Sequence, residues 1–172
     1  MKTHKIAVLP GDGIGPEVME EAIKVLDAIS KKYKVKFEYN FADAGGIAYD
    51  KYGTAMPAKT LKICENSDAI LFGSVGGPKW ENLPREKSIE RVALLGLRKH
   101  FDFFANLRPA VLYKSLAKIS PLKEAIVKKG FDMLIVRELS SDAYFGKKVS
   151  EEGFASDEMV YRKHEVERIA KF

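Results

Sequence analysis

Three arginines lie beside segments that the sequence marks as buried, and each has the chemistry to bind a carboxylate. They are Arg98, Arg108 and Arg137. Arg108 follows the strand-like run ANL, and Arg137 ends the apolar run FDMLIV. A guanidinium forms paired, charge-assisted hydrogen bonds to carboxylates, so these positions suit a small dianionic ligand. For any one of them a structural ion pair is an equally good explanation, and Glu138 is a ready partner for Arg137.

Two glycine-rich loops could bring the backbone close to a ligand. The first is VLPGDGIGPE, from Val8 to Glu17, which is typical of a strand, a turn and a helix start that attracts anions. Its spacing is not G-x-G-x-x-G, so a Rossmann dinucleotide site is disfavoured. The second loop, Gly73 to Pro84, follows a buried run at the position where open α/β sheets bind ligands. We expect it to expose Trp80, the only tryptophan.

Tyr144 and Cys64 are the remaining reactive side chains that need an interpretation. Tyr144 could be a core aromatic residue or a proton donor, and spacing alone does not decide between them. Cys64 is the single cysteine and has no His or Asp nearby at catalytic spacing. We interpret it as a small buried hydrophobic residue.

Alternating strand and helix patterns predict an α/β protein with a largely parallel sheet. We expect strands at 5–9, 35–41, 69–72, 103–107 and 131–136, and helices at 16–32, 57–66, 89–100 and 122–129. Pro10 and Pro109 are expected to end their strands. A helical pattern also runs to Phe172 and stops there without a cap, so we expect a truncated chain.

Composition excludes several function classes. Hydrophobic residues make up 46% of the 172 residues and charged residues 31%, as in an ordinary globular protein. The net charge is +5, but lysines and arginines are spread along the chain, so we expect no nucleic-acid partner. Apolar runs are too short to span a bilayer, and no signal peptide is present, so we expect no membrane partner and a cytoplasmic location.

Seven ordered segments resemble the β-decarboxylating dehydrogenase family, which includes isopropylmalate, isocitrate and tartrate dehydrogenases. The segments are VLPGDGIGPE, ILFGSVGGPKWENLP, LLGLRKHFDFFANLRPA, SPLK, LIVREL, AYFG and EVERIA. Within the family, the combination of GSVGGPKW, LLGLRK and FANLRP resembles the isopropylmalate branch. The resemblance implies the fold of that branch, which is not a Rossmann fold, with a mostly parallel sheet flanked by helices. The chain would correspond to the N-terminal half.

The resemblance also implies roles for individual residues. Arg98, Arg108 and Arg137 would bind the carboxylates and hydroxyl of a malate core, and Leu94 and Leu95 would line a pocket for the isopropyl group. Tyr144 would protonate the enolate left by decarboxylation. NAD would contact Ile14, Gly77, Pro78, Lys79, Trp80, Glu81, Asn82, Leu83, Pro84 and Glu90.

Other parts of such an enzyme would lie outside this chain. The metal, Mg²⁺ or Mn²⁺, would have no ligands here, and the catalytic base is also expected elsewhere. The resemblance implies a homodimer when full length. Residues 1–103 would form part of a first domain and 104–172 the start of a second, incomplete one.

Alternatives remain open at this point. A sister specificity (isocitrate, homoisocitrate or tartrate) is one, although the apolar Leu94 and Leu95 disfavour a carboxylated side chain. A catalytically inactive truncated polypeptide is another. The chain also departs from the family at Ser140-Ser141-Asp142, where two glycines are usual. The Asp142 carboxylate could alter proton transfer by Tyr144.

Overall fold

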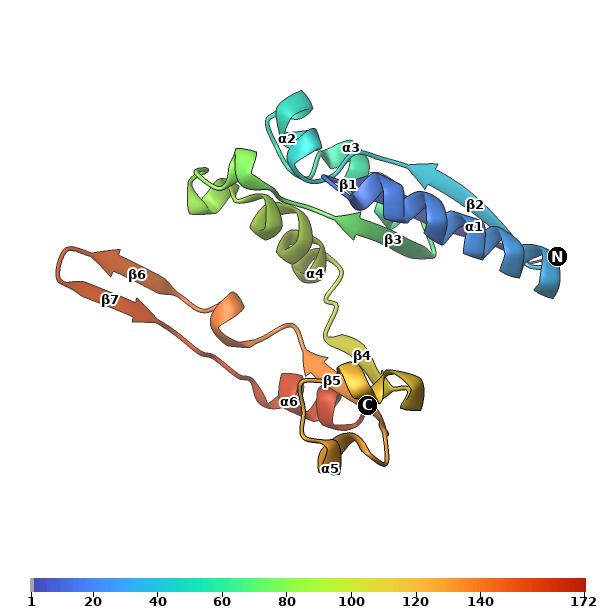
Figure 1. The fold of residues 1–172 in the computed structure, drawn as a ribbon. Coiled ribbons are helices and arrows are strands. Elements are labelled where there is room, and N and C mark those ends of the chain that lie inside the picture. Colours follow the sequence, from blue (N-terminus) through green and yellow to red (C-terminus); the bar gives the residue numbers. More distant parts are fainter. Residues whose placement is uncertain (1) are drawn as a thin grey trace. The chain divides into compact units, whose positions relative to one another are not determined.

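Two structural units divide the chain between His100 and Phe101 in the computed structural model, which describes residues 2–172 (Figure 1). Unit 1 contains β1 (Thr3–Gly11), α1 (Gly15–Tyr33), β2 (Lys36–Phe41), α2 (Gly46–Tyr52), α3 (Ala58–Glu65), β3 (Ala69–Ser74), a π-helix (Arg91–Leu95) and α4 (Gly96–His100). Unit 2 contains β4 (Ala105–Leu112), α5 (Glu124–Val127), β5 (Phe131–Glu138), β6 (Lys148–Glu151), β7 (Phe154–Asp157) and α6 (Lys163–Ala170). Short 3-10 turns connect several of these elements.

Unit 1 is built on a parallel sheet with the strand order β2-β1-β3. Ile6 and Val8 on β1 pack with Met19 of α1 in the core on one face of the sheet. Ala7 and Leu9, which alternate with them, are fully buried too, so both faces of the central strand are covered. The predicted α/β class with a parallel sheet and flanking helices is confirmed.

The elements predicted in unit 1 are present, with three differences. Pro10 does not end β1, because the strand continues to Gly11, where it pairs with Ser74 at the end of β3. Helix α2 was not predicted, since its seven residues are too few to show an apolar period. The segment predicted as one helix over 89–100 is instead a π-helix followed by α4.

Cys64 is buried in α3, as predicted. Burial raises the pKa of its thiol, which disfavours the nucleophilic thiolate.

Unit 2 pairs its strands in antiparallel ladders, β4 with β5 and β6 with β7. The prediction that Pro109 ends its strand was wrong, because β4 runs through it and pairs it with Leu134. Among residues 2–172, β4 pairs with β5 alone, and a strand with one open edge accommodates a residue that lacks an N–H. The hairpin β6–β7 was not predicted, and the predicted helix over 122–129 is shortened to α5.

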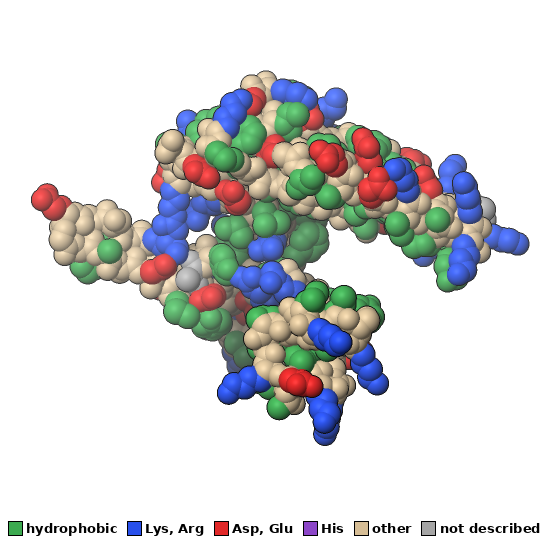
Figure 2. Space-filling view, in the orientation of Figure 1, with side chains coloured by type: hydrophobic (Ala, Val, Ile, Leu, Met, Phe, Trp, Pro, Cys, Tyr) green, Lys and Arg blue, Asp and Glu red, His purple; other side chains and the backbone are tan. Residues whose placement is uncertain are grey.

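On the face of the molecule shown in Figure 2, lysine and arginine side chains are spread over both units. In the described part of the chain, no helix is long and apolar enough to cross a membrane.

Candidate functional site

Asp12 connects the loops that follow β1, β2 and β3. Its carboxylate, which is buried, accepts N–H groups from Gly46 at 2.6 Å, Ile47 at 2.8 Å and Gly76 at 2.9 Å. The first two donors open α2, where a helix leaves its N–H groups without intrahelical partners. One carboxylate therefore pairs the first N–H groups of α2 and also holds the second glycine-rich loop at the carboxyl end of the sheet.

Two glycines allow this close packing of loops. Gly11 has φ +76°, and a Cβ there would lie 1.9 Å from the Ser74 carbonyl oxygen. Gly76 has φ +98°, and a Cβ there would lie 2.2 Å from Glu90 Oε1. The predicted cofactor residue Glu90 thus lies against the second glycine-rich loop, and Ser88 Oγ donates to its carboxylate at 3.2 Å.

Trp80 is not exposed, contrary to the prediction. It is half-buried against the core cluster that contains Ala55 and Ile89, and its indole N–H donates to Asp50 Oδ1 at 3.1 Å. Lys79 donates to the other oxygen of Asp50 at 2.6 Å, and these bonds from Lys79 and Trp80 lower the pKa of the Asp50 carboxyl. The sequence could not reveal this packing because the partner Asp50 lies on α2, which was not predicted.

The other predicted cofactor residues lie on the surface of unit 1 or just below it. Ile14 is 58% exposed at the start of α1. The exposed positions of the loop are Pro78, Lys79, Glu81, Asn82 and Pro84, and Gly77 and Leu83 are half-buried.

Leu94 and Leu95 lie half-buried in the π-helix, and Arg98 lies half-buried in α4 directly after it. π-Helical turns are rare in proteins, and those that occur are often found at functional sites. Arg98 belongs to unit 1, whereas Arg108 and Arg137 belong to unit 2. The structure therefore places Arg98 only with respect to unit 1.

Arg108 and Arg137 share one face of the β4–β5 ribbon. Asn106 is directly opposite Arg137 in the ladder, and Arg108 follows Asn106 by two residues. Opposite residues, and residues two apart on a strand, point to the same face. Arg108 Nε also donates to Asn106 Oδ1 at 3.2 Å, so the two guanidinium groups flank one amide side chain.

Tyr144 joins this face through Arg137. Arg137 Nη2 donates to the Tyr144 hydroxyl oxygen, and the guanidinium carbon lies 5.2 Å from the centre of the Tyr144 ring. Tyr144 is 40% exposed, so solvent reaches part of this residue. Because the guanidinium donates to the phenolic oxygen, the phenolic proton is available to another acceptor.

Asp142 adopts the left-handed conformation, with φ +73°, a region that favours glycine. Its carboxyl lies beside Tyr161, and partial desolvation together with Asp142 raises the pKa of the Tyr161 phenol. The hydroxyl of Tyr144 is bonded to Arg137 instead.

Sequence reasoning missed the roles of Asp12 and Glu165. Asp12 was seen only as part of the first glycine-rich loop, although an acid between two glycines at a strand end is a signal for loop anchoring. Glu165 is the third residue of α6, and a glutamate at that position is a known capping signal.

Comparison with known proteins places the chain in a family. Residues 5–172 match the isocitrate/isopropylmalate dehydrogenase family. The chain belongs to this family. It is 58% identical over 170 residues to 3-isopropylmalate dehydrogenase of Campylobacter jejuni strain RM1221, covering 99% of this chain and 48% of that protein. It is 57% identical over 175 residues to the 3-isopropylmalate dehydrogenase of Aliivibrio fischeri strain ES114, again covering 99% and 48%. The chain thus spans about half the length of these relatives.

Solved structures of the family share this fold. An apo β-decarboxylating dehydrogenase from Thermococcus kodakarensis is 33% identical with a TM-score of 0.67, over 98% of this chain and 43% of its own. The isocitrate dehydrogenase of Methylococcus capsulatus is 25% identical with a TM-score of 0.77, over 98% of this chain and 45% of its own. The fold of this dehydrogenase family, predicted from the ordered motifs, is confirmed.

Proposed function

We propose that this chain supplies the substrate-carboxylate site and part of the cofactor site of a 3-isopropylmalate dehydrogenase. The reaction is the NAD- and divalent-metal-dependent oxidative decarboxylation of 3-isopropylmalate to 4-methyl-2-oxopentanoate in leucine biosynthesis. The observation that carries the proposal is the shared face of β4–β5, where Arg108 and Arg137 stand together and Arg137 holds Tyr144. The relatives' names support the substrate.

The arginines bind the malate core. Arg108 and Arg137 present two guanidinium groups on one face, which suits the paired carboxylates of a small dianion. Arg98, from α4, completes the set in the proposal. Leu94 and Leu95 in the π-helix take the isopropyl group, because an apolar wall favours an alkyl side chain over the carboxylate of isocitrate.

The loops at the carboxyl ends of β1 and β3 form part of the NAD site. The residues of these loops would hold NAD, which would supply the acceptor for the hydride of the hydroxyl-bearing carbon. Asp12 fixes the loop that contains Gly76, and Glu90 lies against that glycine, so a ligand on this surface meets backbone and one carboxylate. Ile14 and the stretch from Gly77 to Pro84 extend the contact, which fits a crevice outside the strand ends.

Tyr144 donates the proton that ends the reaction. The guanidinium of Arg137 donates to the phenolic oxygen and directs the phenolic proton away from itself. Protonation of the enolate carbon by this phenol gives the 2-oxo acid product. Arg137 therefore both binds substrate and orients the acid.

The proposal takes the metal ligands from outside this chain. Over residues 2–172, no group of three or more His, Cys, Asp or Glu side chains is placed to hold a cation. We place the Mg²⁺ or Mn²⁺ ligands and the base outside this chain, in an assembly that is a homodimer in the cytoplasm. In it, residues 1–103 contribute to a first domain and residues 104–172 begin a second.

A hybrid enzyme tests this proposal. In the hybrid, this chain replaces the matching stretch of the Campylobacter jejuni relative. With 3-isopropylmalate, NAD and Mg²⁺ we expect NADH and CO₂ to appear in equal amounts. A hybrid that folds, as judged by circular dichroism, and yet releases no CO₂ would contradict the proposal.

A second candidate is that the chain by itself is a catalytically inactive polypeptide. It follows from placing the metal ligands and the base outside this chain. We expect the purified 172-residue chain to reduce no NAD under conditions in which the hybrid does. Turnover by a sample whose mass is verified would exclude this candidate.

A further inference from the structure

The loop that carries Tyr144 is tied down at its first residues by Glu138 at the end of β5. The Glu138 carboxylate accepts the backbone N–H of Ser140 at 2.7 Å and that of Ser141 at 2.9 Å, and the Ser140 hydroxyl also donates to it. The carboxylate thus accepts donors from the two residues that lie four and three positions before Tyr144. It does not reach beyond Ser141.

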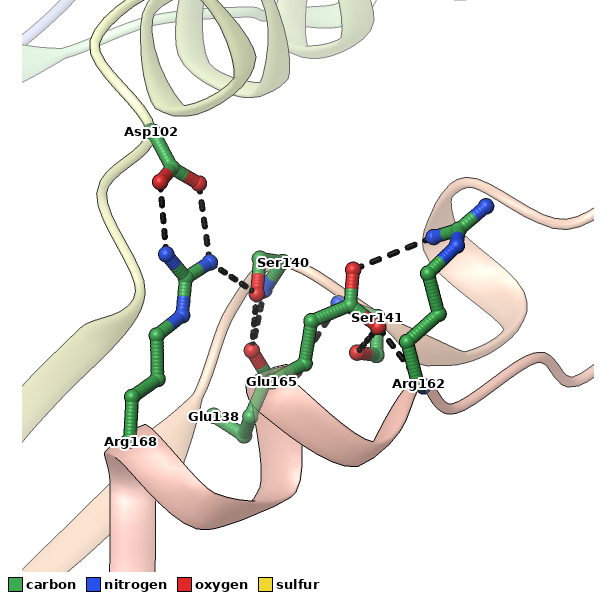
Figure 3. Close-up of polar contacts among 7 residues, drawn as sticks. All are labelled: Asp102, Glu138, Ser140, Ser141, Arg162, Glu165 and Arg168. Carbon is green, nitrogen blue, oxygen red and sulfur yellow. Dashed lines mark hydrogen bonds and ion pairs between the residues drawn. The ribbon is translucent and has the colours of Figure 1, made fainter. Parts of the chain in front are cut away.

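Helix α6 provides a second set of anchors, on the side chains of the two serines (Figure 3). Ser141 Oγ donates to Glu165 Oε2 at 2.8 Å, and both side chains are buried. Arg168 Nη2 donates to Ser140 Oγ at 2.8 Å. A glycine at position 141 would offer no hydroxyl to Glu165, and a glycine at position 140 would offer none to Arg168.

Each anchor is itself held in place. Glu165 accepts the Arg162 backbone N–H at 2.8 Å and the Arg162 guanidinium at 3.1 Å, as in a helix capping box. Burial alone would raise the pKa of Glu165, but the hydrogen bonds from Ser141 and Arg162 outweigh it and the pKa lies below its ordinary value. Arg168 forms a two-pronged ion pair with Asp102, at 2.5 and 2.8 Å. These contacts fix the rotamers of both anchors.

We propose that Glu165 and Arg168 are positioning residues that act through Ser141 and Ser140 to hold the Tyr144 phenol at Arg137. The inference rests on the proposed function, since it assigns Tyr144 the role of proton donor. The loop needs such anchors, because Asp142 between the serines and Tyr144 holds a left-handed backbone that is unfavourable for most residues. Without them the turn at Asp142 can relax and carry Tyr144 away from the guanidinium.

The test compares Ser141→Ala and Glu165→Gln in the hybrid enzyme by two measurements. Misplacing a catalytic group by about 1 Å costs up to roughly 100-fold in rate, so we expect kcat to fall by about 10- to 100-fold while KM for 3-isopropylmalate changes less than about 2-fold. Amide hydrogen exchange of residues 142–146 should accelerate. Ser141→Ala removes one hydroxyl and leaves Glu165 bonded to Arg162, so it separates loss of positioning from loss of α6.

Matched controls alter the same groups outside the loop. Ser156→Ala removes an exposed hydroxyl on β7, and Glu167→Gln neutralises an exposed glutamate on α6. Both should keep kcat and exchange within about 2-fold of the parent. Unchanged exchange over residues 142–146 in Ser141→Ala, or an equal loss of kcat in the controls, would overturn the inference. An inactive parent hybrid would contradict the proposed function, and the exchange measurement would still decide the positioning.

Discussion

At the residue scale, Arg137 has two proposed tasks, which are to bind a substrate carboxylate and to orient the Tyr144 phenol. A lysine can perform only part of the first task. Arg137→Lys keeps the charge but loses the planar fork that reaches both a carboxylate and the Tyr144 oxygen. A hydrogen bond to a charged group is worth about 1.5–3 kcal/mol, which corresponds to roughly 10- to 100-fold in kcat/KM for 3-isopropylmalate. Steady-state kinetics of the hybrid should show this loss with KM for NAD unchanged. A kcat/KM within 2-fold of the parent would remove Arg137 from the site.

Asp142 offers a stability test of the loop. Among the described residues, its Oδ1 is buried without a hydrogen-bond partner, and its φ is +73°. Asp142→Gly removes the unpaired oxygen and the backbone strain, and it also makes the unfolded chain more flexible. Because the first effect is expected to outweigh the second, the free energy of unfolding should rise by about 0.5–1 kcal/mol.

Denaturant unfolding of the hybrid measures this change. Asp132→Gly, at an exposed position in the regular strand β5, is the control and should destabilise by about 0.5–1 kcal/mol. Equal losses for both variants would show that Asp142 is not strained.

At the scale of elements, Asp12 holds the start of α2 and the second glycine-rich loop together by accepting N–H groups from both. Asp12→Asn leaves one carbonyl oxygen for three N–H groups and points an NH₂ at one of them. A buried donor without a partner costs about 1–3 kcal/mol, so the unfolding free energy of the hybrid should fall by that amount. KM for NAD should rise, since Gly76 is no longer fixed.

Asp43→Asn is the matched control, because Asp43 makes a partly exposed ion pair with Lys51 at 2.9 Å. Such a pair is worth at most about 1 kcal/mol. If Asp43→Asn raised KM for NAD as much as Asp12→Asn, the loop assignment would be wrong.

We expect Glu165 of helix α6 to make the stability of the folded protein decrease at acidic pH. The pKa of Glu165 is lowered in the folded protein, so its contribution is complete above the unfolded value of 4.5 and is lost as pH falls through the folded value. The melting temperature of the hybrid should therefore drop as the pH falls below about 4.5, and that of Glu165→Gln should drop less. Parallel curves for the parent and Glu165→Gln would contradict this.

Periodicity predicted the elements whose patterns are long or strongly apolar. Helix α1 and strands β1, β2 and β3 fall where the sequence places them, because their apolar residues share one face or are buried on both. The π-helix was missed because its one-residue offset leaves the apolar pattern of a helix almost unchanged. The path of β4 through Pro109 depends on which edge has a partner, and that is a property of the fold.

For the whole molecule, the sequence named most of the candidate site and missed what holds it in place. Their positions after apolar strands marked Arg108 and Arg137 as candidate carboxylate-binding residues. The register of the β4–β5 ladder places both on one face. The bonds of Asp12 to α2 and of Glu165 to Ser141 join residues 34 and 24 positions apart, so the local signals at Asp12 and Glu165 do not identify these partners. A single sequence carries little information about hydrogen bonds between loops that are far apart along the chain.

The central claim is that the residues of this chain select 3-isopropylmalate within the family. The most direct test compares kcat/KM of the hybrid for 3-isopropylmalate, isocitrate and tartrate, because Leu94, Leu95 and the arginines all come from this chain. An apolar pocket that must bury an unpaired carboxylate pays at least several kcal/mol, so we expect 3-isopropylmalate to be favoured by at least about 100-fold. A higher kcat/KM for isocitrate would contradict the account.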